Sequence, residues 1–422
     1  MATASGSTWL REAGPSDLFR LHDFRLLLAI QVAAGLRGPL LWFAQAWYVN
    51  DAAADGRRVL LLGVLATVNG SAFLGWSLFG GALADRYPRR TMLMASHLAG
   101  AVCVAATAVV LLLPGVGGGG WFFVILPLFA TFGLMNAQDL PARTALVADL
   151  VPDRLVIAAV TMNWLVLAVV MLIANYLGGV LVETLGFGLT YALGIAPHLV
   201  IAFLLSRLEL ANVAADAEAS GRSLLRNVQD GFAHLRRDPA VRWTVLLMWV
   251  SVAGGVNVLW TLGAWWMDEV LHVDPAGWSV LTVFWSIGMV IASVTLFVMG
   301  DYRSKGRKYL IAALISATAV LVYALSRSVV LTGAALLVAG FAFQNQQTIA
   351  TAILQTIVPR NLLGRVTALL FLSQGLAQTS GLAFGALGQL IGLPAMFPAI
   401  ALAMLASAIA VAVLQRPLRL LA

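Results

Sequence analysis

Residues 156–181 read VIAAVTMNWLVLAVVMLIANYLGGVL, and none of these side chains carries a charge. The hydrocarbon core of a bilayer is about 30 Å thick, so a helix needs roughly 20 apolar residues to cross it. No water is available there to bond the backbone N–H and C=O groups, which must therefore pair within the segment, as they do in a helix. This stretch predicts a transmembrane helix.

The composition extends this interpretation to the whole chain. Hydrophobic residues make up 61% of the 422 residues and charged residues only 11%, whereas soluble domains carry roughly 25% charged residues. A soluble fold of this length could not cover its surface with so few charges and is excluded. We predict an all-α integral membrane protein with twelve transmembrane helices, at 25–49, 60–83, 92–113, 121–140, 156–181, 186–206, 243–267, 277–299, 309–326, 328–349, 365–389 and 395–415.

The lysines and arginines predict how these helices are oriented. If the N-terminus is cytoplasmic, 22 of the 26 basic residues lie in cytoplasmic segments, three lie in outside loops, and Arg37 falls within a span. Basic residues favour the cytoplasmic side of a membrane. We therefore expect both termini in the cytoplasm and a location in the cell inner (plasma) membrane. This orientation also explains the net charge of +7, which does not indicate nucleic-acid binding.

The sequence does not gather residues that could support an enzyme, a metal site or a cofactor. Cys103 is the single cysteine, which excludes disulfide frameworks, thiolate zinc sites and iron–sulfur clusters. The five histidines are too widely spread to suggest a metal site, and no catalytic or ATP-binding motif is found. We expect no enzymatic activity and no cofactor.

The chain divides into two similar halves. Residues 144–155 and 351–362 share a Val-Pro pair at the same offset, and the loop 81–90 has a counterpart at 300–308. Duplicated six-span halves with a substrate site between them are typical of secondary transporters. We predict a cytoplasmic segment at 1–24, an N-terminal bundle at 25–206, a linker with an amphipathic helix at 207–242, a C-terminal bundle at 243–415 and a cytoplasmic tail at 416–422.

The loop after the second span carries the most specific motif. Its pattern Gly81-x-x-x-Asp85-Arg86-x-x-Arg89-Arg90 resembles the signature loop of the major facilitator superfamily. Pro88 and the runs 45–49, 139–143 and 357–365 resemble the enterobactin-exporter, or transmembrane secretion effector, branch. The resemblance implies a twelve-helix fold of two pseudo-symmetric bundles. It also implies a conformational latch of cytoplasmic charges, which here would comprise Gly81, Asp85, Arg86, Arg89, Arg90, Asp139, Arg143, Asp301 and Arg307.

Arg37, near the middle of the first span, requires an explanation. A charge in the hydrocarbon layer costs at least about 2.5 kcal/mol. One hypothesis is that Arg37 faces the central cavity and meets an anionic substrate group or a coupling carboxylate. The alternative is a structural residue that bonds backbone carbonyls or reaches a wet vestibule. Asp139 and His97 could each titrate during transport, although the sequence favours Asp139 as a member of the latch and His97 as a packing residue.

Neutral polar side chains predict where a substrate could bind. Amides facing lipid are unfavourable, so most should face inward. The resemblance implies that the first, fourth, seventh and tenth spans line the cavity. The candidate cavity residues are Arg37, Gln45, Asn136, Gln138, Asn257, Gln344 and Asn345.

These observations together predict a secondary active transporter. The resemblance implies export of a small amphipathic molecule (a siderophore, drug or metabolite) by alternating access, with a proton as the coupling ion and a monomer in the lipid bilayer. An importer or an anion-coupled carrier using Arg37 is the alternative within transport. A non-transporting membrane sensor is the alternative outside it, but the longest loop is too short for a soluble signalling domain.

Overall fold

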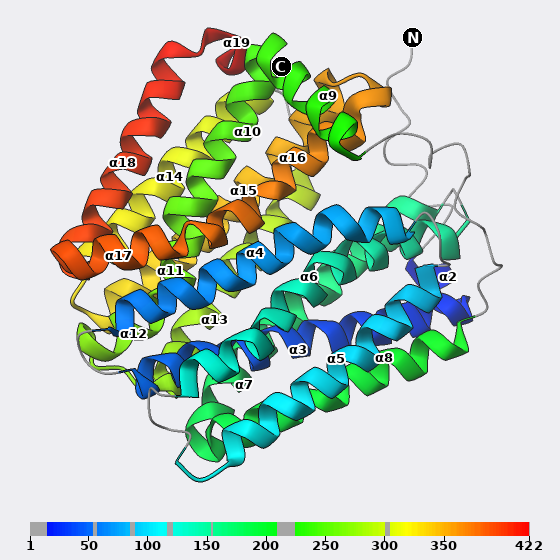
Figure 1. Ribbon diagram of the computed structural model, residues 1–422. Helices are drawn as coiled ribbons and strands as arrows, with labels where there is room; N and C mark the ends of the chain where they lie inside the picture. Colours follow the sequence, from blue (N-terminus) through cyan, green and yellow to red (C-terminus); the bar gives the residue numbers. More distant parts are fainter. Residues whose placement is uncertain are drawn as a thin grey trace.

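The computed structural model describes residues 15–53, 57–84, 89–115, 121–152, 155–208, 224–299 and 304–421. Every regular element within these ranges is a helix. Figure 1 shows two groups of helices side by side, one coloured blue to green and the other green to red. The predicted all-helical fold of two six-helix bundles is confirmed.

The first group contains the first half of the chain. Its helices are α2 (Pro15–Arg20), α3 (His22–Ala52), α4 (Arg58–Ala84), α5 (Arg89–Leu112), α6 (Phe122–Leu150), α7 (Val156–Leu193) and α8 (Ile195–Arg207). α7 is interrupted at Gly186, whose φ of 76° and ψ of 176° are not helical. A side chain is strained at positive φ, so glycine allows the chain to reverse there. The arm after Gly186 continues into α8 and forms the sixth predicted span.

The second group contains the second half. Its helices are α9 (Leu224–Arg237), α10 (Pro239–Ser251), the π-helical segment η4 (Val252–Asn257), α11 (Val258–Thr261), α12 (Gly263–Glu269), α13 (Pro275–Met299), α14 (Lys305–Leu325), α15 (Val329–Ile357), α16 (Arg360–Thr379), α17 (Gly381–Ile391), α18 (Leu393–Leu414) and α19 (Arg416–Arg419).

Each predicted span corresponds to one helix or to a short series of helices. Nine stretches of the described ranges are long and apolar enough to cross a membrane, and one of them, Leu165–Arg207, covers both the fifth and sixth spans. The fourth span is represented by the apolar part of α6, Phe122–Ala137. The seventh and eleventh spans are broken helices. The seventh changes to a π-helix at η4, a distortion that is common at functional sites.

α9 is the amphipathic helix that the linker predicts. Its last turns pack on α16 and α10, with Leu235 buried and Phe232 edge-on to Trp249 at 6.4 Å between ring centroids. Figure 1 shows it beside the α10 and α16 ends that lie near the C-terminus.

The two bundles meet along two lines of contact. In the first, α4 packs on both parts of the broken eleventh span, α16 and α17; in the second, α7 packs on α13. Glycines allow these backbones to approach closely: a Cβ added to Gly63 would collide with the carbonyl of Gly381, and one added to Gly179 would collide with that of Pro275. Between α7 and α13, Asn175 Nδ2 donates to Ser286 Oγ at 3.1 Å.

A threonine hydroxyl fills the break between α16 and α17. Thr67 Oγ1 of α4 donates to the carbonyl of Thr379 and accepts from the N–H of Leu382, at 3.2 and 2.7 Å. Backbone groups released by a helix break must find partners inside a membrane protein. The break is therefore stabilised by the opposite bundle.

Polar contacts join the bundles at the end where α3 finishes and α4 begins. Arg58 Nη1 lies 3.3 Å from Asp268 Oδ2 and 2.8 Å from Glu269 Oε1, and Asn50 Nδ2 donates to Asp268 Oδ2 at 3.0 Å. The N–H of Ala276 donates to Glu183 Oε2 at 3.0 Å. The basic-residue distribution predicts that this end is extracellular. Partly exposed ion pairs are worth only about 0–1 kcal/mol each, so this closure is easily reversed.

The Gly63 contact generates a stability prediction. Gly63→Ala places its Cβ against the backbone of Gly381 and Gly385, which cannot yield as a side chain could. We expect a loss of roughly 1–3 kcal/mol, as for other overpacked sites, measured as a lower midpoint of thermal unfolding in detergent. Gly75→Ala on the same helix is the matched control, because no atom lies within 4 Å of its added Cβ. Equal midpoints for the two variants would contradict the close approach of α4 to α17.

Candidate functional site

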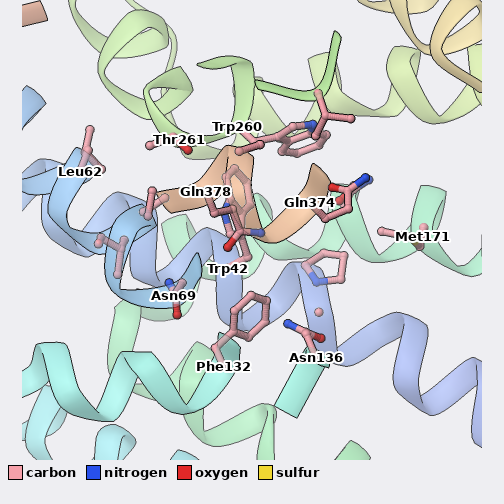
Figure 2. A pocket seen from close by; sticks show the side chains of 18 residues that line it. Trp42, Leu62, Asn69, Phe132, Asn136, Met171, Trp260, Thr261, Gln374 and Gln378 are labelled. Carbon is pink, nitrogen blue, oxygen red and sulfur yellow. The ribbon is translucent and has the colours of Figure 1, made fainter. Parts of the chain in front are cut away.

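A cavity of about 340 Å³ lies between the two bundles. Figure 2 shows the side chains of its wall gathered from both halves of the chain. Its aromatic and sulfur-containing members are Trp42, Phe132, Met171 and Trp260, and its polar members are Asn69, Asn136, Asn175, Thr261, Gln374 and Gln378. Among the described residues, no charged side chain lines this cavity. The wall can therefore stack on an apolar ring system and bond polar substituents through amides.

Tryptophans from both bundles close one side of the cavity. Trp42 of α3 lies edge-to-face with Trp260 of α11 and with Trp278 of α13, both at 5.0 Å between ring centroids. Trp260 in turn lies 6.3 Å from Trp285. Such pairs contribute about 0.5–1.5 kcal/mol each beyond area burial. They form an apolar contact between the two bundles at the wall of the cavity.

A buried charge cluster lies behind the wall on the side of the first bundle. Asp139 of α6 is 2% exposed, and its carboxylate binds two arginines. Arg37 Nη2 lies 2.9 Å from Asp139 Oδ2. Arg143 Nε and Nη2 lie 2.7 and 3.1 Å from the two oxygens. Arg143 Nη1 also donates to Gln31 Oε1. The two arginines therefore share one carboxylate, and each buried charge has an oppositely charged neighbour.

Two histidines extend the charge cluster away from the cavity. His97 Nε2 of α5 lies 3.2 Å from Asp139 Oδ1, and His97 Nδ1 lies 3.2 Å from His198 Nδ1 of α8. Both rings are buried. The cluster therefore joins α3, α5, α6 and α8 in a single polar network.

Asn136 connects the charge cluster to the cavity. The same Arg37 Nη2 that binds Asp139 also donates to Asn136 Oδ1 at 3.2 Å, and Asn136 lines the cavity together with Gly38 and Pro39. Arg37 is 3% exposed. It thus lies just behind the cavity wall and contacts a carboxylate of this chain. No backbone carbonyl is among its hydrogen-bond partners in the described part of the chain.

The other predicted cavity residues lie in different surroundings. Gln45 bonds the hydroxyl of Tyr191 at 2.6 Å and accepts from Asn69 at 3.2 Å, so it joins three helices of the first bundle. Gln344 bonds Thr348 and Asn345 bonds the carbonyl of Phe341, both within α15. Gln138 and Asn257 occupy α6 and η4, but their side chains are outside the described ones.

Other cavity and cluster residues carried weaker sequence signals. The sequence does not indicate Trp42, Phe132 or His198 as site residues. Aromatic residues are common throughout the spans, and a single histidine in a span does not show which residue it contacts. The amides of Asn69, Asn175, Gln374 and Gln378 are visible in the second, fifth and eleventh spans. Only the meeting of the bundles shows which of them face the cavity.

The predicted latch falls largely outside the described residues. Asp85, Arg86 and Asp301 lie there, and the side chains of Gly81 and Arg89 are likewise not described. Arg90 Nη2 donates to the carbonyl of Ser206 at 2.6 Å, and Arg307 is exposed near the start of α14. The described partners of Asp139 and Arg143 belong to the charge cluster. The latch stays a prediction. Among the described residues, no three histidine, cysteine, aspartate or glutamate side chains are placed so that they could hold a metal ion.

Comparisons with known proteins give the family. The model of the "Major Facilitator Superfamily" matches residues 27–382. "Multidrug efflux pump Tap" of Mycolicibacterium fortuitum is 25% identical over 392 residues, which cover 90% of this chain and 92% of that protein.

Solved transporters share the fold. The nucleoside transporter NupG superposes with a TM-score of 0.69 at 13% identity, covering 92% of this chain and 98% of its own. The inward-open xylose transporter XylE from E. coli superposes with a TM-score of 0.67 at 17% identity, covering 91% and 96%. At these identities the likeness shows the fold alone. Because the family match spans most of its length, this chain belongs to the Major Facilitator Superfamily and is a multi-pass membrane carrier of small molecules, not an enzyme.

Proposed function

We propose that this chain exports a small amphipathic molecule (a siderophore, drug or metabolite) across the cell inner membrane, and that inward movement of a proton drives the export. The observation that carries the proposal is the Arg37–Asp139 pair placed directly behind Asn136 in the cavity wall. The similarity to a multidrug efflux pump and the resemblance to the enterobactin-exporter branch support the direction. The basic-residue distribution supports cytoplasmic termini, and we propose that the monomer is the working unit.

The shared guanidinium nitrogen gives a physical basis for antiport. Arg37 Nη2 divides its hydrogen bonding between Asp139 and Asn136. When Asp139 takes up a proton, its attraction for Arg37 falls and Arg37 binds Asn136 more tightly. Asn136 is then less able to accept a hydrogen bond from a substrate. Proton and substrate therefore compete through one nitrogen, as exchange transport requires.

The cavity supports the substrate class. Sites for drug-sized molecules have volumes of roughly 300–1,000 Å³ and combine apolar walls with a few polar groups, and the cavity of about 340 Å³ meets both conditions. Rings can stack on Trp42 and Trp260, while the amides of Gln374 and Gln378 bond polar substituents. Transport then requires the two bundles to rock about this cavity, opening the closure between Arg58 and Asp268.

An anion-coupled carrier is a second candidate, because the charge cluster is not balanced. Two arginines face one carboxylate, and Arg37 Nε has no hydrogen-bond partner among the described residues. An anion bound beside Arg37 would neutralise the excess charge. Proteoliposomes with an imposed pH gradient separate the candidates by the sign of the substrate-linked proton flux. In export by antiport the proton and the substrate move in opposite directions, whereas in proton-coupled import they move in the same direction. An anion-coupled carrier gives no substrate-linked proton flux.

Arg37→Gln tests the coupling role. Gln cannot hold the carboxylate by charge, so protonation of Asp139 no longer changes the Asn136 amide. We expect efflux in a strain lacking its own exporters to be abolished for every compound of a chemically varied panel that the wild type exports, with normal amounts of protein in the membrane. Arg57→Gln, an exposed arginine before α4, is the matched control and should retain efflux. Unchanged efflux by Arg37→Gln would refute the role.

The cluster holds two arginines and one carboxylate, so loss of the carboxylate should destabilise the protein more than loss of one arginine. Asp139→Asn leaves two buried arginines without a counter-charge, which should cost roughly 3–5 kcal/mol. Arg37→Gln leaves the Arg143–Asp139 pair neutral and should cost much less. Thermal unfolding of the purified variants in detergent measures both, with Asp51→Asn at the exposed end of α3 as control. The expectation is wrong if Arg37→Gln lowers the midpoint as much as Asp139→Asn does.

A further inference from the structure

The imidazole pair formed by His97 and His198 has no role in substrate contact. Neither ring lines the cavity, and the exposed fractions of the two side chains are 2% and 0%. The rings lie 5.3 Å apart between centroids with a tilt of 55°, so their Nδ1 atoms face each other at 3.2 Å. Burying two such polar rings is unfavourable unless their nitrogens are used.

The hydrogen bonds assign the tautomers of both rings. Asp139 is held as an anion by two arginines, so it accepts, and His97 Nε2 must donate to it. A neutral imidazole has one N–H and one acceptor nitrogen, so His97 Nδ1 accepts. His198 Nδ1 must then be the donor between the rings. His198 Nε2 is left as an acceptor, and it has no hydrogen-bond partner among the described residues.

A glycine makes room for this arrangement. A Cβ on Gly100 of α5 would lie 2.6 Å from Cε1 and 2.8 Å from Nδ1 of His198, closer than any real Cβ contact. The same added Cβ would also lie 2.8 Å from the terminal methyl carbon of Met135. The His198 ring is therefore fixed between α5 and α6 with Nδ1 directed at His97. The unpartnered Nε2 belongs to a ring that its surroundings hold in place.

We propose that His198, His97 and Asp139 form a proton relay that delivers the coupling proton to the carboxylate. A proton that arrives at His198 Nε2 forms an N–H bond there, while His198 Nδ1 releases its proton to His97 Nδ1. His97 Nε2 then releases its proton to Asp139 Oδ1. One proton is gained at Nε2 of His198 and one is delivered to the carboxylate. Both rings stay neutral but exchange tautomers, and the relay is reset when the proton returns from Asp139 along the same path.

The neighbouring charges favour transfer through the imidazole pair over storage in it. The titratable and charged groups around the rings are Asp139 and Arg143 of α6 and Arg37 of α3, with the amide of Gln31 beside Arg143. Both rings are buried, which disfavours a lasting imidazolium, and the excess of arginine over carboxylate charge adds to this effect. From the cavity, Arg37 and Asn136 stand in front of Asp139. The histidines therefore offer the carboxylate a proton path on the side away from the substrate.

The relay rests on the proposed proton coupling, and its test separates the two. His198→Gln fills the site with a side chain that hydrogen-bonds but does not titrate. In proteoliposomes, we expect substrate-linked proton flux to fall by about 10²-fold or more, the usual contribution of a positioned proton-transfer group. Substrate counterflow without a pH gradient should stay at the wild-type level, since the cavity is untouched. His22→Gln, an exposed histidine at the start of α3, is the matched control and should leave both rates unchanged.

A second variant covers the case in which His198→Gln does not fold. Gly100→Ala keeps both histidines and the carboxylate but displaces the His198 ring, so it should lower proton flux while counterflow persists. Wild-type proton flux in a folded His198→Gln or Gly100→Ala protein overturns the relay and leaves coupling at Asp139 standing. Absence of substrate-linked proton flux in the wild type overturns the proposed coupling itself, and the relay with it.

Discussion

A charged side chain inside the hydrocarbon layer must be paired, and the pairing of Arg37 with Asp139 organises the first bundle. Arg37 belongs to α3 and Asp139 to α6, and the remaining bonds of the carboxylate bring in Arg143 and His97. A polar network of this kind fixes the relative rotation of its helices, because a turned helix would leave a buried charge without a partner. The orientation of Asn136 in the cavity wall follows from the same network.

The contacts between the bundles are of a different kind from those within the first bundle. Glycine backbones meet along α4 and α17, aromatic rings meet between α3 and α11, and partly exposed ion pairs meet at Arg58. None of these requires one fixed geometry in the way that a buried charge does. These contacts can therefore change without unpairing a buried charge, since small residues allow sliding and weak surface pairs allow opening. The cavity lies at this adjustable boundary.

Much of the fold could be predicted because the bilayer restricts what a segment can be. Each of the twelve apolar stretches has its helix, since no other local structure satisfies the backbone in hydrocarbon. The broken seventh and eleventh spans were not predicted. Gly254-Gly255 and Gly381 are compatible with a break, but Thr67, which satisfies the released backbone groups of the eleventh span, comes from a helix more than three hundred residues earlier in the sequence.

The sequence by itself determined that the chain is helical and membrane-spanning, that it has two related halves, and that Arg37 needs a partner. Those properties depend on composition and on local periodicity, which are written along the chain. Only the tertiary structure decided that the partner is Asp139, that His97 and His198 face each other, and that Asn69 and Gln378 share a cavity wall. Such pairings depend on the rotation and contact of helices distant in sequence, and hydrophobicity in a span gives little information about which face of the helix turns inward.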